Sequence, residues 1–106
     1  MWIFTNTGFL SVVAHRDKKD TLLVRGRRSG EIESIFPKAS VYELDNADYH
    51  YRSEIKRDEV AQVMASQVQN IGYDNFKSSV SDNKRHDAYK DVWSIMSAYQ
   101  ASGITR

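Results

Sequence analysis

Arginine and tyrosine residues in the first half of the chain form the first candidate binding set. Arg25 and Arg27 alternate along one predicted strand, and Tyr49, Tyr51 and Arg52 lie on another. A guanidinium can form paired hydrogen bonds with phosphate or carboxylate, and a tyrosine ring can stack on a base or contact a protein. These residues therefore predict a binding surface for a macromolecule.

Although the net charge is only +1, basic and acidic residues cluster in two different segments of the chain. His15–Arg28 holds six Lys or Arg against two Asp, whereas Ser29–Asp48 holds five acidic residues and one Lys. A basic stretch can attract phosphate, but it can equally form a solvated hairpin that pairs with Glu43, Asp45 or Asp48. Because the net charge is far below that of a dedicated phosphate binder, a protein partner ranks ahead of nucleic acid, which stays the alternative.

A second candidate set combines Tyr73, Asp74, Asn75 and Lys77, with Phe76 between them. It brings a carboxylate, an amide and an ammonium group within one helical turn, where they could bind a ligand in a cleft. In the structural alternative, Asp74 caps a short helix while Tyr73 and Phe76 pack in a corner of the core. Asn75 and Lys77 have no predicted structural role, so they are the better functional candidates.

No pattern in the chain predicts catalysis. Ser11 has no nucleophile-elbow motif, the five glycines are scattered, and cysteine is absent. His15, His50 and His86 lack the paired spacing typical of metal ligands. We expect no metal and no cofactor, and we favour a non-enzymatic role. The alternative is a small enzyme or ligand-binding protein that uses the Tyr73–Lys77 cluster.

The first half must supply the strands that position the arginines. Alternating apolar residues and turn residues predict strands, with one short helix that begins near Ser29 and stops at Pro37. The strands are predicted over Trp2–Thr5, Phe9–Ala14, Thr21–Arg27, Ser40–Leu44 and Tyr49–Lys56. In the last of them, alternation places Tyr49 and Tyr51 on one face and Arg52 on the other.

The second half is predicted to be helical. Apolar residues at helical spacing predict a helix over 60–71, started by Asp58 and ended by Gly72, a short helix after Asp74, and a last helix over about Lys84–Gln100. Strands followed by helices predict an α+β fold, an antiparallel sheet of about five strands covered by the C-terminal helices. The length predicts one domain over residues 1–106.

Five large apolar residues are expected in the core rather than on the surface. They are Trp2, Phe4, Tyr89, Trp93 and Met96. If the last helix instead exposes part of this set, a hydrophobic partner face or a homodimer is expected.

Several blocks of the sequence are similar to a family of short uncharacterised bacterial and phage proteins. The blocks are Met1–Thr5, Gly8–Val13, Leu22–Arg27, Ala47–Arg52, Ile71–Lys77 and Tyr89–Trp93. They span most of the chain in the order that the family shows. The resemblance supports the domain boundaries and implies no activity, and the family's occurrence in phages implies that a partner would be a host protein.

The composition places the chain among soluble globular proteins. No apolar run approaches the roughly 18 residues of a membrane span, and no signal-peptide pattern opens the chain. We expect a cytoplasmic, non-catalytic binding or regulatory module with a protein partner, and a homodimer stays open.

Overall fold

A computed structural model describes residues 1–103, which divide between two compact units, Met1–Gly72 and a second unit that begins at Tyr73. The single domain expected over residues 1–106 stays a prediction.

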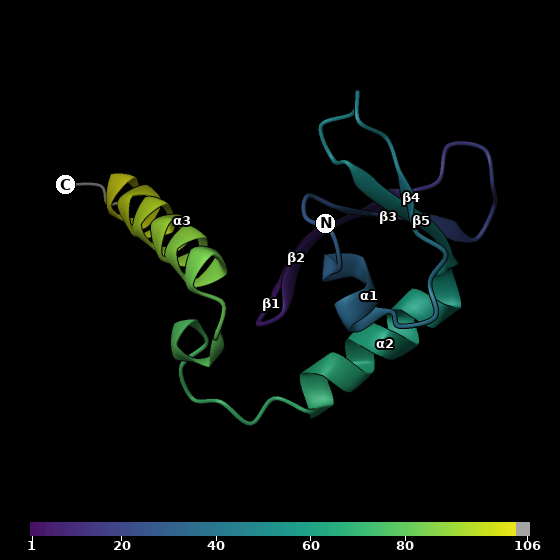
Figure 1. The fold of residues 1–106 in the computed structure, drawn as a ribbon. Coiled ribbons are helices and arrows are strands. Elements are labelled where there is room, and N and C mark those ends of the chain that lie inside the picture. Colours follow the sequence, from purple (N-terminus) through teal and green to yellow (C-terminus); the bar gives the residue numbers. More distant parts are fainter. Residues whose placement is uncertain (104–106) are drawn as a thin grey trace. The chain divides into compact units, whose positions relative to one another are not determined.

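The first unit is built on a five-stranded antiparallel sheet (Figure 1). The strands follow the spatial order β1-β2-β3-β5-β4. Their bounds are β1 Trp2–Thr5, β2 Gly8–Ala14, β3 Thr21–Gly26, β4 Tyr42–Glu43 and β5 Tyr51–Lys56. Together with the C-terminal helices, this sheet confirms the predicted α+β class.

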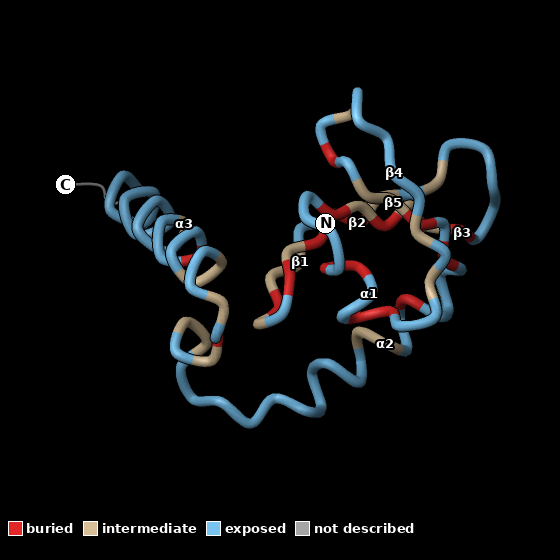
Figure 2. Tube along the Cα trace, in the orientation of Figure 1, coloured by how far each residue is buried: buried red, intermediate tan, exposed pale blue. Residues whose placement is uncertain are grey.

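One face of the sheet carries the core of this unit. Side chains of β2, β3 and β5 pack there against α1 (Glu31–Ile35) and the first half of α2 (Arg57–Gln69). In Figure 2 the buried, red stretches of this unit lie largely in the strands and around α1. The buried cluster consists of Leu10, Val12, Val24, Ile32, Ile35, Phe36, Ile55 and Val60. Since α1, its C-cap Phe36 and α2 together supply half of it, the sheet needs these helices for its stability.

Two glycines allow α1 to lie close to the sheet. A Cβ atom at Gly8 would lie 2.9 Å from Cβ of Glu31, and one at Gly26 would lie 3.2 Å from Cγ1 of Ile32. Both distances are shorter than ordinary van der Waals contact. The helix can therefore approach β2 and β3 only because these positions lack a side chain.

Helix starts and the later strands differ from the sequence-based expectation. The N-cap of α1 is Gly30, at φ 90°, instead of Ser29, and the N-cap of α2 is Lys56, which places Asp58 in the first turn. Strand β4 has only two residues, and β5 begins at Tyr51.

The second unit contains a short 3₁₀ helix, η1 (Lys77–Ser79), and the long helix α3 (Asn83–Ser102). The Asp82 carboxylate caps α3 by accepting a 2.8 Å hydrogen bond from the backbone N–H of Arg85. Among the described residues of this unit, only Val80 and Tyr89 are buried. The prediction that Trp93 and Met96 belong to the core is wrong, because both are exposed on α3.

Across residues 1–103, no helix combines the length and the apolar character that crossing a bilayer requires.

Candidate binding surface

The sheet register aligns five side chains in one row across all five strands. Trp2 lies opposite Ser11, Ser11 opposite Arg25, Arg25 opposite Arg52, and Arg52 opposite Tyr42. Residues directly opposite each other in an antiparallel sheet point to the same face. This set, named here the arginine row, therefore occupies the face opposite the core. Two guanidinium groups lie at its centre and one aromatic ring at each end.

Tyr49 supports the arginines from beside the row. Its ring centroid lies 4.6 Å from Cζ of Arg25 and 4.2 Å from Cζ of Arg27, and the residue is only 4% exposed. The Asp48 carboxylate accepts a 2.8 Å hydrogen bond from the Tyr49 N–H, which fixes the bend before β5. Two cations over one largely buried ring form a desolvated cation–π arrangement.

Hydrogen bonds fix the three guanidinium groups further. Nη2 of Arg25 donates to the buried hydroxyl of Ser11 at 2.7 Å, and Nη1 of Arg27 donates to the backbone carbonyl of Asp48 at 3.1 Å. Arg52 donates from Nε to the Tyr49 carbonyl at 3.2 Å and from Nη2 to the Asp48 carboxylate at 3.3 Å. Because each guanidinium is already ordered, a ligand that meets them incurs little further loss of side-chain entropy.

The Nε–H of Arg25 is buried and has no hydrogen-bond partner among residues 1–103. An unpaired buried donor generally costs free energy, about 1–3 kcal/mol. The cation–π contact with Tyr49 and the bond to Ser11 nevertheless hold this side chain in place.

Aromatic side chains at the two edges of the sheet complete the row. Trp2 is 69% exposed and packs edge-on against Phe9, with ring centroids 5.9 Å apart, and Phe9 in turn lies 4.7 Å from Phe4. At the opposite edge, Tyr42 is also exposed. Sequence reasoning assigned Trp2 to the core, which is wrong, and did not select Tyr42. The strand register that aligns both with the arginines is not visible in local sequence patterns.

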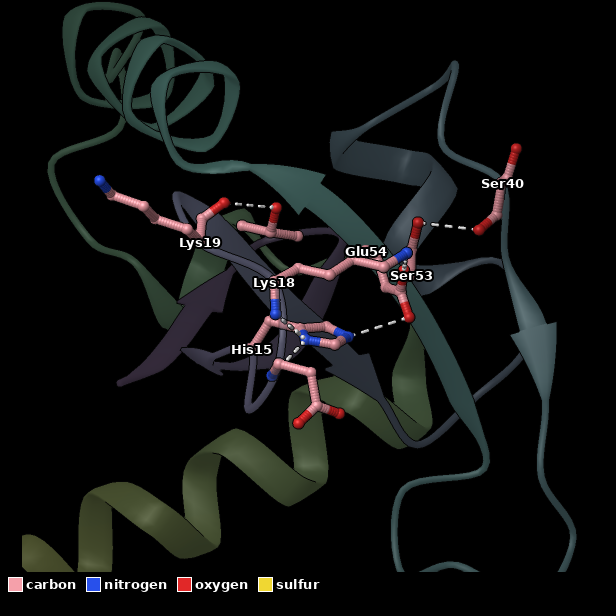
Figure 3. Close-up of polar contacts among 8 residues, drawn as sticks. His15, Lys18, Lys19, Ser40, Ser53 and Glu54 are labelled. Atoms are coloured by element: carbon pink, nitrogen blue, oxygen red, sulfur yellow. Dashed lines mark hydrogen bonds and ion pairs between the residues drawn. The ribbon is translucent and has the colours of Figure 1, made fainter.

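Glu54 anchors the β2–β3 turn on the same face as the arginine row, opposite Leu23 (Figure 3). Its carboxylate accepts from Nε2 of His15 at 3.1 Å and from Nζ of Lys18 at 2.5 Å. Nδ1 of His15 accepts the backbone N–H groups of Asp17 and Lys18, both at 3.0 Å. The hydrogen bond from Lys18, followed by that from His15, lowers the pKa of Glu54, and the same pairing raises the pKa of Lys18.

Acidification is expected to release this turn. The pKa of Glu54 lies below its ordinary value of 4.5. The stabilisation of the turn by the contacts of Glu54 with Lys18 and His15 is therefore fully present above pH 4.5 and is lost as the pH falls through the pKa of Glu54 in the folded protein. In an NMR titration, the Lys18 amide and the Glu54 carboxyl carbon should therefore shift together below about pH 4.5. Glu54→Gln should remove the shared transition. A Lys18 amide that titrates identically in this variant would contradict the contact.

Tyr51 lies on the core face, where it packs against the buried cluster and stands opposite Gly26. The expectation that Tyr49 and Tyr51 share one face is therefore wrong. Strand alternation begins only at Tyr51, after the bend at Asp48 and Tyr49. Neither ring is available to stack on a base, because Tyr49 is buried and Tyr51 packs into the core.

The Tyr73–Lys77 cluster belongs to the second unit and has structural contacts of its own. The N-cap of η1 is Phe76, not Asp74, and Oδ1 of Asn75 accepts from the N–H of Ser78 at 3.1 Å and from the Ser78 hydroxyl at 3.2 Å. Nζ of Lys77 lies 4.5 Å from the centroid of the Trp93 ring. Asn75 and Lys77, expected to lack structural roles, both have one. A ligand-binding role for the cluster stays a prediction.

The rings of this cluster continue into α3. Tyr73 and Phe76 have centroids 5.6 Å apart, and Phe76 stacks on the buried Tyr89 at 5.7 Å. The contact between Tyr73 and Phe76 is part of the structural alternative, but Tyr73 is 37% exposed and Phe76 is only partly buried, so the two rings do not form a corner of the core.

Two ion pairs connect the basic and acidic segments to β5. Lys18 of the basic segment pairs with Glu54, and Asp48 of the acidic segment pairs with Arg52. Glu43 lies beside Asp45, and the hydrogen bond and repulsion between the two carboxyl groups raise the pKa of Glu43. Over residues 1–103, no three His, Asp or Glu side chains are grouped as metal ligands.

No protein-family model, curated protein or solved structure matches this chain.

Proposed function

We propose that the chain is a non-catalytic binding module that recognises another protein through the arginine row. The observation that carries the proposal is the alignment of exposed Trp2 and Tyr42 with the ordered Arg25 and Arg52 in one row. Tryptophan, tyrosine and arginine are the residue types most enriched at the energetic centres of protein interfaces.

The surroundings of the arginines favour a protein over a nucleic acid. Arg25, Arg27 and Arg52 already donate to Ser11, Asp48 and Tyr49, and the exposed carboxylate of Asp48 would repel phosphate. The tyrosines that could stack on bases are not available. An apolar partner surface with neutral hydrogen-bond acceptors near its centre, such as backbone carbonyl oxygens, would match the aromatic ends and the remaining guanidinium donors. In line with the resemblance to phage proteins, we propose a host protein as this partner.

Capture from a lysate of the native host, followed by binding measurements with the purified partner, tests the proposal. Trp2→Ala and Tyr42→Ala should each weaken binding by about 10- to 30-fold in calorimetry, because each removes an exposed aromatic anchor. Val68→Ala removes from α2 an apolar side chain about as exposed as Trp2 and should leave the affinity unchanged.

Two outcomes would contradict the proposal. One is a partner whose affinity changes in neither aromatic variant. The other is a captured species that is lost on nuclease treatment and whose binding falls steeply with salt, since that would support nucleic-acid recognition instead.

A further inference from the structure

The second half of α3 carries no charged residue on any side. From Val92 to Gly103 the chain contains no Asp, Glu, Lys or Arg, although the first half of the same helix is rich in them. Trp93, Ile95, Met96 and Tyr99 are each between 52% and 70% exposed. Figure 2 accordingly draws most of α3 in pale blue. A solvent-facing helix normally bears charges on its outer side, so this segment has the composition of an interface.

The second unit is also too small to be stable on its own. It has 34 residues, no cysteine, and only Val80 and Tyr89 buried among its described residues. Units below about 40 residues usually need disulfides, a metal or association with another chain. With neither cysteine nor a grouped metal-ligand set in residues 1–103, burial of the exposed apolar face of α3 against another protein surface is the route that remains.

The apolar side chains of this segment form one stripe. At 100° per residue, Val92, Trp93, Tyr99 and Gln100 all lie within about 60° of Met96 around the helix, and Tyr89 lies within about 20° of it. The stripe runs for more than two turns, which is the length over which two helices can pack side by side.

We propose that this stripe binds the same stripe of a second copy of the chain, with the two helices antiparallel and Met96 at the two-fold axis. Such an arrangement brings Trp93 of one copy level with Tyr99 of the other, because each lies three residues from Met96. Val92 and Gln100 are matched in the same way, four residues from the axis. The stripe is thus self-complementary, as an isologous interface requires.

The charged residues of α3 stay outside this seam. Lys90 and Asp91 lie about 120° and 140° from Met96 around the helix, so they point away from the second copy. Arg85 lies within about 20° of Met96, but it is eleven residues before it, beyond the level at which the second helix ends. Placing Met96 at the axis therefore buries no charged residue of α3 between the two helices.

The expected interface is small. The two Trp93 and two Tyr99 rings alone would remove roughly 500 Å² from water, given that each is more than half exposed. Met96 and Val92 bring the total toward about 1,000 Å², the lower end for specific interfaces. We therefore expect a micromolar dissociation constant.

Single cysteines placed in the full chain test the register directly, since the natural chain has none. Met96→Cys should form an intermolecular disulfide nearly quantitatively under copper–phenanthroline oxidation, because the two thiols meet at the axis. Ser94→Cys is the matched control: it lies on the same helix, about 160° away from position 96, and should cross-link little. Equal cross-linking at both positions would overturn the proposal.

Sedimentation equilibrium provides the second measurement. The unmodified protein should change from monomer to dimer as its concentration rises through the micromolar range. Met96→Glu should weaken the association at least about 100-fold, because it places two carboxylates together at the axis. Circular dichroism of Met96→Glu tests whether α3 still forms. An unmodified protein that stays monomeric at high micromolar concentration overturns the proposal.

The outcome is independent of the arginine row. Met96→Glu should leave the intrinsic affinity of each chain for its protein partner unchanged, whereas Trp2→Ala should leave dimerisation unchanged.

Discussion

Replacing Phe36 with alanine is expected to lower the free energy of unfolding of the first unit by about 3–5 kcal/mol. Phe36 is among the largest fully buried side chains and belongs to the cluster between α1 and the sheet. Its N–H also donates to the Ile32 carbonyl at 2.8 Å, so the residue closes α1 as well as filling the core. Small domains have a total stability of about 5–15 kcal/mol, and this one change therefore removes a large part of it.

Urea denaturation followed by circular dichroism measures the effect. Phe36→Leu retains most of the apolar volume and should cost less than about 1.5 kcal/mol. A loss below about 1 kcal/mol in the alanine variant would show that the site collapses around the cavity, or that Phe36 is not central to the core.

Tyr49→Ala should cost a similar amount, about 3–4 kcal/mol, although Tyr49 lies outside the apolar cluster. The substitution removes a buried ring and leaves Arg25 and Arg27 without the surface that they share. The two guanidinium groups would then repel each other over a cavity. We expect partner binding to fall as well, because the arginines would no longer be ordered before the partner arrives.

Two milder variants separate the contributions of Tyr49. Tyr49→Phe keeps the ring and should change stability by less than about 1 kcal/mol, whereas Tyr49→Leu keeps apolar volume but loses the cation–π contacts, worth about 0.5–2 kcal/mol. The Nε–H signals of Arg25 and Arg27 in NMR spectra should broaden in Tyr49→Leu and stay sharp in Tyr49→Phe. Equal behaviour of the two variants would mean that the ring acts through its volume alone.

Local patterns in the sequence predicted much of the sheet. Strand β1 was placed correctly, and β2 and β3 to within one residue, because apolar alternation and the turn at Asn6–Gly8 both mark them. The last helix was likewise predicted as Lys84–Gln100 and is observed as Asn83–Ser102. These elements have strong periodicity, so neighbouring residues alone determine them.

The errors arose where long-range contacts decide the structure. Tyr49 could be placed only by knowing that Asp48 bends the chain and that Arg25 and Arg27 lie beneath the ring. Trp2 and Trp93 look like core residues by type, and their exposure depends on what the rest of the chain leaves uncovered. Arg25, Arg27, Tyr49 and Arg52 were each selected from the sequence, but strand register brings Arg25 beside Arg52, and the contacts of the Tyr49 ring bring it together with Arg25 and Arg27.

Arg25 and Arg27 also protect the fold against mispairing. In β3, Leu22, Val24 and Gly26 face the core while Leu23 and Arg25 face away from it. A slip of one residue would exchange the two faces and place a guanidinium where Val24 is now completely buried. A sheet with this slipped register would bury an unpaired guanidinium. The arginines that we propose for partner binding therefore also disfavour the one-residue slip of β3. Uncharged residues at these positions should therefore favour the correct register of β3 less strongly, and they should also weaken the preference for the partner.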